Sequence, residues 1–286
     1  MPTIIRSRSA RRLVCGSIAS ALGSVASVAV LAIATPAYAQ LAPPNAAGVT
    51  FGHVHLNVKD INVHRKLWVE HFGGVVVEKG PLVAVKLPGM LIALRQAEPT
   101  GGSEGTVMDH FGFKVRNLSE ILAAWRAAGY QVGREFIGAE GFPNAYLMGP
   151  DNLKLEVQED KTLAVKASAY HLHFLLADYV KLRDWYVDTF SLEPRKRGTI
   201  ATTADAPGMN LSFATSATPT VGTKGRAIDH IGFEITNLEA FCKKLEARGV
   251  KFDVPFRNVP AIGLNIAYIT DPSGVYIELT EGYNKY

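Results

Sequence analysis

The chain has 286 residues, of which 48% are hydrophobic and 20% are charged, so it is neither intrinsically disordered nor fibrous. Its formal charge of +4 comes from the first 39 residues, which hold four arginines and no acidic residue. The remainder is neutral, with 26 basic and 26 acidic residues. The charge therefore favours neither nucleic acid nor an anionic membrane surface as a partner, and we predict a small-molecule ligand instead.

Residues 1–39 are predicted to be a signal peptide. Arginines precede a long uncharged stretch from Leu13 to Thr35, and the triplet Ala37-Tyr38-Ala39 has the small-x-small pattern of a cleavage site. We expect an exported protein, periplasmic or secreted, with no stable membrane association after cleavage. The alternative is an uncleaved anchor, because the uncharged run is long enough to span a bilayer. The pair Arg11-Arg12 leaves both the general secretory and the twin-arginine route open.

Cys242 is the only cysteine that follows the predicted signal peptide, since Cys15 lies within it. A single cysteine cannot form an intramolecular disulfide, so a packed core must stabilise the fold. Cys242 falls in an apolar stripe at helical spacing, which predicts a small core residue rather than a catalytic thiol.

A repeat unit occurs four times along the chain. Each copy begins with a histidine on a segment of alternating residues, and the copies start at nearly constant intervals, at His53, His110, His171 and His230. In the first copy the histidine lies on one strand face and Val54, Leu56 and Val58 lie on the other, apolar face. Four buried strands with polar histidine faces are predicted.

A helix and three short strands are predicted to follow each of these strands. In the second and fourth copies Asn117 and Asn237 are predicted helix N-caps, and Gly129 and Gly249 are predicted to end the helices. Turn residues separate the three short strands. Each unit is therefore predicted to be βαβββ, and the fold class to be α+β.

Alternate copies resemble each other, which predicts that a domain of two units was duplicated. Units one and three share a Pro-Gly-Met turn at Pro88 and Pro207, while units two and four share a glutamate on the last strand, at Glu156 and Glu278. The predicted divisions are a signal peptide at 1–39, a linker at 40–50, a first domain at 51–158, a linker at 159–168 and a second domain at 169–286.

The histidines and the two glutamates lie on polar strand faces. If neighbouring units of one domain curl into a cup, each cup receives two histidines and one carboxylate. The expected sets are His53, His110 and Glu156 in the first domain and His171, His230 and Glu278 in the second. Such a set occupies one face of an octahedral ion and leaves positions for substrate and oxygen. We predict a divalent metal, with Fe(II) favoured over Mn(II), Zn(II) or Ni(II), in one or both domains; the alternative for each histidine is a structural hydrogen bond.

A second histidine follows the first in units one and three, at His55 and His173, on the same strand face. Either member of each pair is a candidate ligand. The second member is also a candidate hydrogen-bonding partner of the ligands, or a proton carrier, since a histidine near the metal can titrate near neutral pH. Gly112 and Gly232 take the equivalent place in units two and four, and leave room for substrate or for the opposing histidine.

The unit motif, a histidine followed by alternating apolar residues and then Asp or Asn, resembles that of the vicinal oxygen chelate superfamily. This superfamily includes glyoxalase I, bleomycin- and fosfomycin-resistance proteins and type I extradiol dioxygenases. The motif runs from His53 to Asp60, from His110 to Asn117, from His230 to Asn237 and, more loosely, from His171 to Asp178. The segment from Tyr268 to Glu278 is typical of the superfamily. The resemblance implies two tandem domains of this fold and a metal site.

Four units in one chain are similar to the extradiol dioxygenases. That resemblance implies that His171, His230 and Glu278 hold Fe(II) and that a catechol binds through both oxygens. It also implies a catalytic role for Tyr268, for which the alternative is an aromatic that only packs on its strand. Val259 replaces a histidine of the extradiol signature, and His173 is the candidate acid in its place.

Other activities of the superfamily remain as alternatives. Glyoxalase-type isomerisation resembles a site with a second glutamate as base, where this chain has Ala93 and Ser212. Thiol transferases of the fosfomycin-resistance kind use two histidines and one glutamate, so the ligand set does not exclude them. A non-catalytic alternative is a protein that sequesters a small aromatic ligand. We predict an exported, metal-dependent oxygenase acting on a catecholic or similar small oxygenated substrate; its oligomeric state, homo-oligomer included, stays open.

Overall fold

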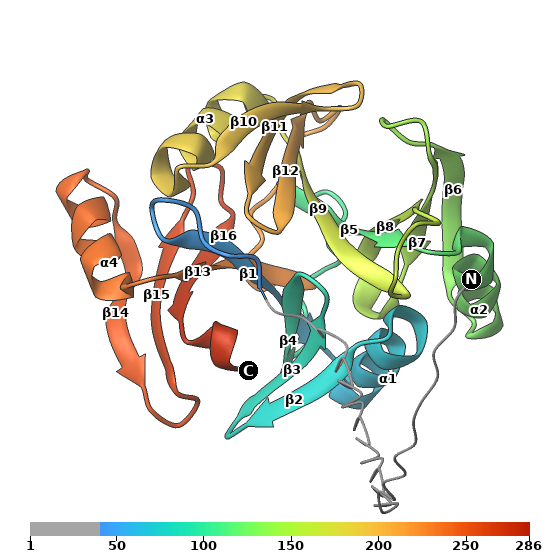
Figure 1. Cartoon of the computed structure of the whole chain (residues 1–286), viewed down its shortest axis with the longest axis horizontal. Helices are drawn as coiled ribbons and strands as arrows, with labels where there is room; N and C mark the ends of the chain where they lie inside the picture. The colour runs from blue at the N-terminus through green and yellow to red at the C-terminus, as the bar shows by residue number, and fades with distance from the viewer. Residues whose placement is uncertain (1–40) are drawn as a thin grey trace, which may run out of the picture. The chain divides into compact units, whose positions relative to one another are not determined.

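The computed structural model describes residues 41–286 (Figure 1). The predicted signal peptide and its cleavage site lie outside these residues. Within them, no helix is both long and apolar enough to cross a membrane.

The described residues form the four predicted βαβββ units. Unit one comprises β1 (Val49–Val58), α1 (Ile61–Phe72), β2 (Val75–Lys79), β3 (Leu82–Leu87) and β4 (Met90–Gln96). Unit two comprises β5 (Met108–Val115), α2 (Leu118–Ala127), β6 (Gln131–Ile137), β7 (Pro143–Met148), the 3₁₀ turn η1 (Pro150–Asn152) and β8 (Lys154–Glu159). Unit three comprises β9 (Ala167–Leu175), α3 (Tyr179–Phe190), β10 (Glu193–Arg197), β11 (Ile200–Ala206) and β12 (Met209–Ala214). Unit four comprises β13 (Ile228–Ile235), α4 (Leu238–Ala247), β14 (Phe252–Val259), β15 (Leu264–Thr270), β16 (Tyr276–Glu281) and the 3₁₀ turn η2 (Tyr283–Lys285).

Local chemistry of the sequence explains the helix boundaries. The side chain of Asn117 accepts a hydrogen bond from the backbone N–H of Glu120, and Asn237 caps α4 in the same way through Ala240. Both are the predicted N-caps, which satisfy a free N–H group of the first turn. Cys242 is buried in α4, and burial raises the pKa of its thiol to about 11, as expected for a core residue.

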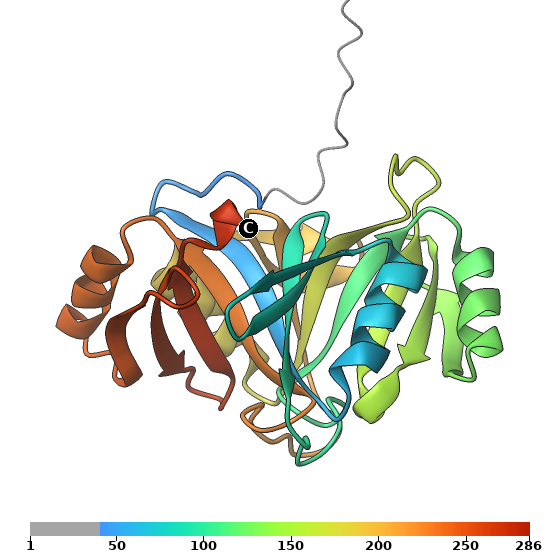
Figure 2. The same cartoon turned by 90° about the horizontal axis from the view of Figure 1, so that it is seen from below.

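The units pair across the sequence rather than along it. One eight-stranded sheet has the order β14-β15-β16-β13-β1-β4-β3-β2 and joins units one and four; we call it sheet 1/4. The other has the order β10-β11-β12-β9-β5-β8-β7-β6 and joins units two and three; we call it sheet 2/3. Figures 1 and 2 show β1, in blue, beside β13, in orange, from the far end of the chain. The expectation that neighbouring units of one predicted domain share a cup is therefore wrong.

The connections between units account for this pairing. The shortest one, 160–166, joins β8 to β9, and it keeps units two and three in one sheet, where β9 pairs with β5. The longer connections, 97–107 and 215–227, pass from one sheet to the other. They hold each other through hydrogen bonds from Thr100 N to Gly225 O and from Val107 N to Val221 O. The predicted linker at 159–168 thus lies inside sheet 2/3, although it marks the boundary of the sequence repeat.

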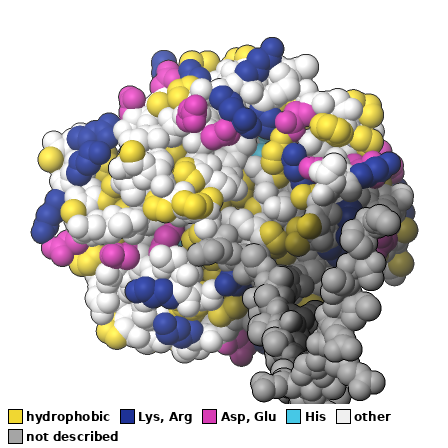
Figure 3. All heavy atoms as spheres, in the orientation of Figure 1, with side chains coloured by type: hydrophobic (Ala, Val, Ile, Leu, Met, Phe, Trp, Pro, Cys, Tyr) yellow, Lys and Arg dark blue, Asp and Glu magenta, His cyan; other side chains and the backbone are white. Residues whose placement is uncertain are grey.

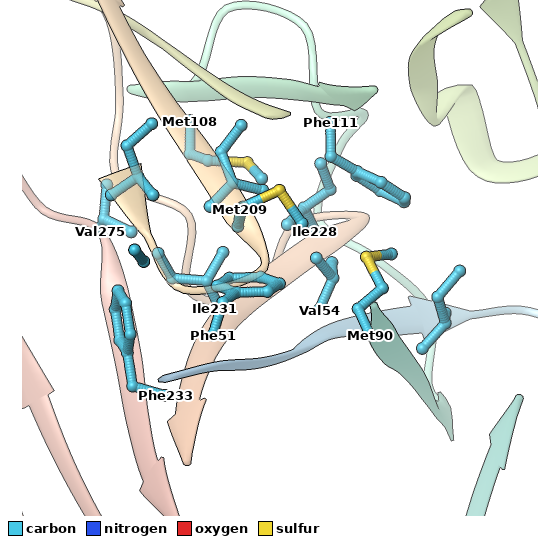
Figure 4. Packing of buried hydrophobic residues seen from close by; sticks show 14 of the residues in the cluster. Phe51, Val54, Met90, Met108, Phe111, Met209, Ile228, Ile231, Phe233 and Val275 are labelled. Carbon is cyan, nitrogen blue, oxygen red and sulfur yellow. The ribbon is translucent and has the colours of Figure 1, made fainter. Parts of the chain in front are cut away.

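A single core holds the two sheets together. The apolar strand faces of all four units contribute to one buried cluster, part of which is drawn in Figure 4. Phe51 of β1 and Phe233 of β13 meet edge to face at 5.9 Å. The Pro-Gly turns also link the sheets, since Phe51 N donates to Pro207 O and Ala169 N donates to Pro88 O. Burial of apolar area in this core, rather than a disulfide, supplies most of the stability of the fold.

The opposite face of each sheet is curled inward. In sheet 2/3 the hairpin tips at the two edges meet, because Thr199 N donates to Ala139 O at 2.9 Å. In sheet 1/4 the tip glycine Gly80 lies against Ala261 so closely that a Cβ there would be 2.7 Å from its carbonyl oxygen. Each sheet therefore forms a cup. On the face shown in Figure 3, basic and acidic side chains are interspersed, in agreement with the neutral balance of the described part of the chain.

Candidate metal centres

In each cup, two histidine-bearing strands from different units lie beside one glutamate-bearing strand. In sheet 1/4 the order β16-β13-β1 places Glu278, His230 and the pair His53 and His55 on adjacent strands. In sheet 2/3 the order β8-β5-β9 repeats this arrangement with Glu156, His110, His171 and His173. In each sheet one donor atom from each of the four side chains lies within 4.8 Å of the others. We call these groups centre 1/4 and centre 2/3.

The predicted site residues are therefore brought together, but in other combinations than expected. The sets His53, His110, Glu156 and His171, His230, Glu278 are wrong. The first unit gives its histidines to Glu278 of the last unit, and Glu156 meets the histidines of unit three. The physical reason is the pairing of β1 with β13 and of β5 with β9.

The strand register explains why the side chains converge. His53, Gly232 and Glu278 are direct neighbours across three strands, so the glycine stands between the histidine and the carboxylate. A Cβ on Gly232 would lie 1.9 Å from Cε1 of His53, and one on Gly112 would lie 2.2 Å from Cε1 of His171. The imidazole occupies the space above the glycine. Each glycine thus leaves room for a histidine, although this histidine comes from another unit than the one expected.

Both carboxylates lie at hydrogen-bonding distance from their histidines. Oε2 of Glu278 is 2.9 Å from Nε2 of His53 and 3.1 Å from Nε2 of His230. Oε2 of Glu156 is 3.0 Å from Nε2 of His110 and 3.4 Å from Nε2 of His171. Burial alone would raise the pKa of each carboxyl, but the neighbouring histidines outweigh it and hold the pKa well below the ordinary value. Both centres therefore contain an ionised carboxylate.

An aspartate precedes one histidine of each centre and fixes its ring. Oδ1 of Asp229 accepts from Nδ1 of His230 at 2.6 Å, and Asp109 binds His110 in the same way at 2.6 Å. Burial opposes the charged form of His230, but hydrogen bonds to Asp229 and Glu278 raise its pKa. With Nδ1 held as the donor, Nε2 is directed into the centre. The sequence analysis missed these aspartates, although the Asp-His pair recurs in units two and four.

His55 and His173 are members of the centres and not bystanders. The ring of His55 lies 4.4 Å from that of His230, and the ring of His173 lies 4.9 Å from that of His110, centre to centre. Both nitrogens of His55 and Nε2 of His173 are buried without a hydrogen-bond partner. Burial, then the neighbouring histidines, hold the pKa of both well below the ordinary value. The proton-carrier role considered for them would need a pKa closer to neutrality.

The donor set fits a divalent metal. Neutral imidazoles with free lone pairs and an ionised carboxylate are the protonation states that metal binding requires. Unpartnered buried nitrogens at His53 and His171 add to this pattern, since a buried polar atom without a partner is otherwise costly. Three nitrogens and one oxygen suit Fe(II), Mn(II), Ni(II) or Zn(II). The two centres can each hold one such ion.

A tyrosine lies beside each glutamate. Tyr268 is the direct neighbour of Glu278 across β15 and β16, and Tyr146 takes the same place beside Glu156. Burial, then the charge of Glu278, raise the pKa of Tyr268 far above its ordinary value, so it stays protonated. Tyr268 also stacks on Tyr276 at 5.0 Å. Sequence analysis overlooked Tyr146, although it precedes Glu156 by the same interval as Tyr268 precedes Glu278.

Within the described residues, neither β4 nor β12 places an acidic side chain beside His55 or His173. Ala93 is the register partner of His55, and Ser212 is that of His173. Val259, which replaces the signature histidine, lies at the end of β14 and packs in an apolar cluster. The positions that resemblance linked to a base and to an acid are therefore occupied by groups that transfer no proton.

Comparison with known proteins agrees with this architecture. Residues 170–279 match the family model described as the Glyoxalase/Bleomycin resistance protein/Dioxygenase superfamily. The chain is similar to this superfamily over that segment. Its units three and four carry the matched segment, and units one and two repeat the same fold.

Solved structures share the fold over most of the chain. Glyoxalase I from Zea mays has a TM-score of 0.64 at 14% identity, and the match covers 83% of this chain and 94% of that one. A putative dioxygenase from Bacillus subtilis has a TM-score of 0.62 at 11% identity, covering 86% of this chain and 88% of that one. At these identities the likeness shows the fold alone. No curated protein matches the sequence.

Proposed function

We propose that the chain is an exported, divalent-metal-dependent oxygenase that acts on a catecholic or similar small oxygenated substrate. The observation that carries the proposal is the convergence of three imidazoles and one carboxylate in each centre. Export is supported by the sequence pattern of residues 1–39 alone.

The ligand count favours a substrate that chelates. Two histidines and the glutamate of each centre would hold an ion and leave positions for two neighbouring oxygens of one small molecule and for dioxygen. A bound ion would act as a Lewis acid that lowers the pKa of the substrate hydroxyls. We assign His53, His230 and Glu278 as the donors of centre 1/4 and His171, His110 and Glu156 as those of centre 2/3, with His55 and His173 as the alternative histidine of each pair.

The protein side chains around the ligands supply orientation and hydrogen bonds. Asp229 and Asp109 hold their histidines in the ligating tautomer. Tyr268 and Tyr146 stay protonated beside the carboxylates, so each can donate a hydrogen bond to a substrate oxygen and neither serves as a base at neutral pH. Three of the four side chains in each centre are buried, and the low local dielectric strengthens these interactions.

The same surroundings argue against proton-transfer isomerisation of the glyoxalase kind. That reaction needs a base close to the metal, and the positions beside His55 and His173 are Ala93 and Ser212. Oxygen chemistry on a diol would place no such demand on these positions, because it does not require a proton to be removed from a substrate carbon. The oxygenase is therefore the better-supported member of the superfamily's range.

Metal analysis and two activity assays test the proposal. We expect about two divalent ions per chain, one lost in His53→Ala or His230→Ala and the other in His110→Ala or His171→Ala. Oxygen uptake with a panel of catechols should exceed turnover of a methylglyoxal–thiol adduct. Turnover of the adduct without oxygen uptake would support an isomerase. Absence of bound metal after reconstitution with each candidate ion would overturn the enzyme assignment and favour a binding protein.

A further inference from the structure

The two centres contain the same types of side chain, but the walls of their cups differ. We infer that the cup of sheet 2/3 takes a substrate with a carboxylate group, bound by Arg197. The inference rests on the proposed function for the chelating part of the substrate. The carboxylate subsite itself rests on the side chains around Arg197.

Arg197 is the last residue of β10 and is only 3% exposed. Its Nε donates to Oγ of Ser212 at 3.1 Å. Ser212 is the direct register partner of His173 on the neighbouring strand β9, so it lies on the face that carries centre 2/3. The guanidinium is thus bound to the wall of the cup one strand away from the proposed ligands.

The positive charge of Arg197 is incompletely matched. The nearest carboxylate is that of Glu140, whose Oε2 is 3.9 Å from Nη1, beyond hydrogen-bonding distance. Glu140 is itself engaged, since it accepts hydrogen bonds from the hydroxyl of Tyr170 and from Nε2 of Gln158. Hydrogen-bond geometry within residues 41–286 gives the guanidinium a partner at Nε, and its Cζ lies 5.3 Å from the ring centre of Tyr170. A buried cation in this state leaves several N–H donors free for a planar anion.

The corresponding wall of sheet 1/4 lacks this chemistry. Thr203, Asn210 and Ser212 of sheet 2/3 form a hydrogen-bonded chain that ends at Arg197. The strand positions that match them beside centre 1/4 are Ala84, Leu91 and Ala93, as the shared register shows. The position matching Arg197 is Lys79, which is exposed and lies over the ring of Tyr286.

The cup of sheet 1/4 is filled by apolar side chains instead. Leu41, Leu91, Leu264 and Tyr283 form a buried cluster there, and the ring of Tyr283 lies 4.8 Å from that of His53. Sheet 1/4 therefore has the same fold and the same types of donor side chain without polar side chains on the wall of its cup. The fold does not require Arg197 and its chain of hydroxyl and amide groups, so a ligand is the better reason for a buried cation in one copy.

A guanidinium with free Nη groups is suited to two parallel hydrogen bonds with a carboxylate. A neutral diol would chelate the metal but leave the cation unmatched. The structure therefore assigns to centre 2/3 a small oxygenated acid, with its chelating oxygens toward the histidines and its carboxylate toward Arg197. Centre 1/4 offers no such group and is expected to be indifferent to substrate charge.

Binding of benzoate and of benzamide, its neutral analogue, to the metal-free chain tests the carboxylate subsite by calorimetry. We expect benzoate to bind about tenfold or more tightly than benzamide, as for a charge-assisted hydrogen-bonded pair. Arg197→Gln should abolish this preference, and Lys79→Gln, at the matching position of sheet 1/4, should leave it unchanged. Glu140→Gln should tighten benzoate binding because it removes the competing carboxylate.

The outcomes separate this inference from the proposed function. Equal or absent binding of the two probes by the wild-type chain overturns the inference, as does a preference that survives in Arg197→Gln. If Arg197→Gln fails to fold, weaker benzoate binding by Glu140→Gln overturns it instead. With the Zn(II)-loaded chain, 3,4-dihydroxybenzoate should bind more tightly than catechol. A benzoate preference without any diol binding would leave the subsite intact and reject the proposed function.

Discussion

Two glycines determine whether the centres can form. Gly232 and Gly112 lie between a histidine and a glutamate in the strand register, where any side chain would overlap an imidazole. A glycine in the middle of a strand costs stability, because it loses more conformational freedom than other residues and packs nothing. Its presence at both positions is therefore explained by the close approach of the histidines.

Alanine at these glycines should remove one metal at a time. Gly232→Ala should displace His53 and lower the metal content from about two ions to one per chain, with centre 2/3 intact. Gly112→Ala should displace His171 and leave centre 1/4 intact, so each variant serves as the control for the other. Metal analysis combined with His53→Ala or His171→Ala in the same chain identifies the site that is lost. Retention of both ions by either glycine variant would contradict the ligand assignment.

The aspartates behind His230 and His110 should affect metal affinity without being ligands. Asp229→Asn keeps the size of the side chain but removes the charge that holds the ring at 2.6 Å. We expect affinity at centre 1/4 to fall about 10- to 100-fold, as for other hydrogen-bonding partners of metal-bound histidines. Competition with a chelator measures the loss. Asp188→Asn, on the exposed face of α3, is a control that should leave the affinity unchanged.

At the scale of single elements, the turn between β15 and β16 contains a buried acid with an unusual pKa. Oδ1 of Asp271 accepts hydrogen bonds from the backbone N–H groups of Ser273 and Val275, and its Oδ2 accepts one from the hydroxyl of Tyr186. Burial outweighs these bonds and raises the pKa of Asp271 to about 6. The folded state therefore holds this proton more tightly than the unfolded chain does.

This linkage predicts a pH-dependent difference between Asp271→Asn and the wild type. A raised pKa in the folded state means that the stabilising contribution of the protonated acid is present below pH 4 and lost between about pH 4 and 6. Relative to the variant, the wild type should lose about 2 kcal/mol of unfolding free energy across this range. Urea denaturation of both proteins at several pH values measures it. A difference that is constant with pH would contradict the shift.

Single helices and strands could be predicted from the sequence because the residues that determine them are close together in the chain. Alternation of apolar residues identifies the strand face of His53, and capping chemistry identifies the ends of α2 and α4. The internal repeat identifies residues that recur, such as Glu156 and Glu278. It cannot identify Arg197, which occurs in one copy only. That residue becomes recognisable once the register shows what stands at its matching position.

At the scale of the whole molecule, periodicity does not say which copies become neighbours. The alternating pattern of a strand is the same whichever unit lies beside it. Pairing of units that follow each other in the sequence was therefore expected. The lengths of the connections contained the missing signal, since the shortest one lies within a sheet and the longer ones cross between sheets. Each centre consequently depends on both halves of the chain.

This dependence makes a prediction that separates the observed pairing from the sequential one. Residues 159–286 contain His171, His230 and Glu278, which the sequential pairing would unite in one cup. In the structure, His171 and His230 lie in different sheets, so the isolated half should bind no metal as a monomer. Mixing it with residues 40–158 should restore about two ions per pair, because both sheets can then form.

Native mass spectrometry of each half and of the mixture would measure mass and metal content together. Any metal-bound form of an isolated half should have the mass of a dimer, in which unit three of one copy can pair with unit four of another. The full chain with the connection 160–166 intact is the control, since that segment holds units two and three in one sheet. A monomeric second half that retains one ion would show that sequential pairing is also accessible, and it would restore the ligand sets that this structure rejects.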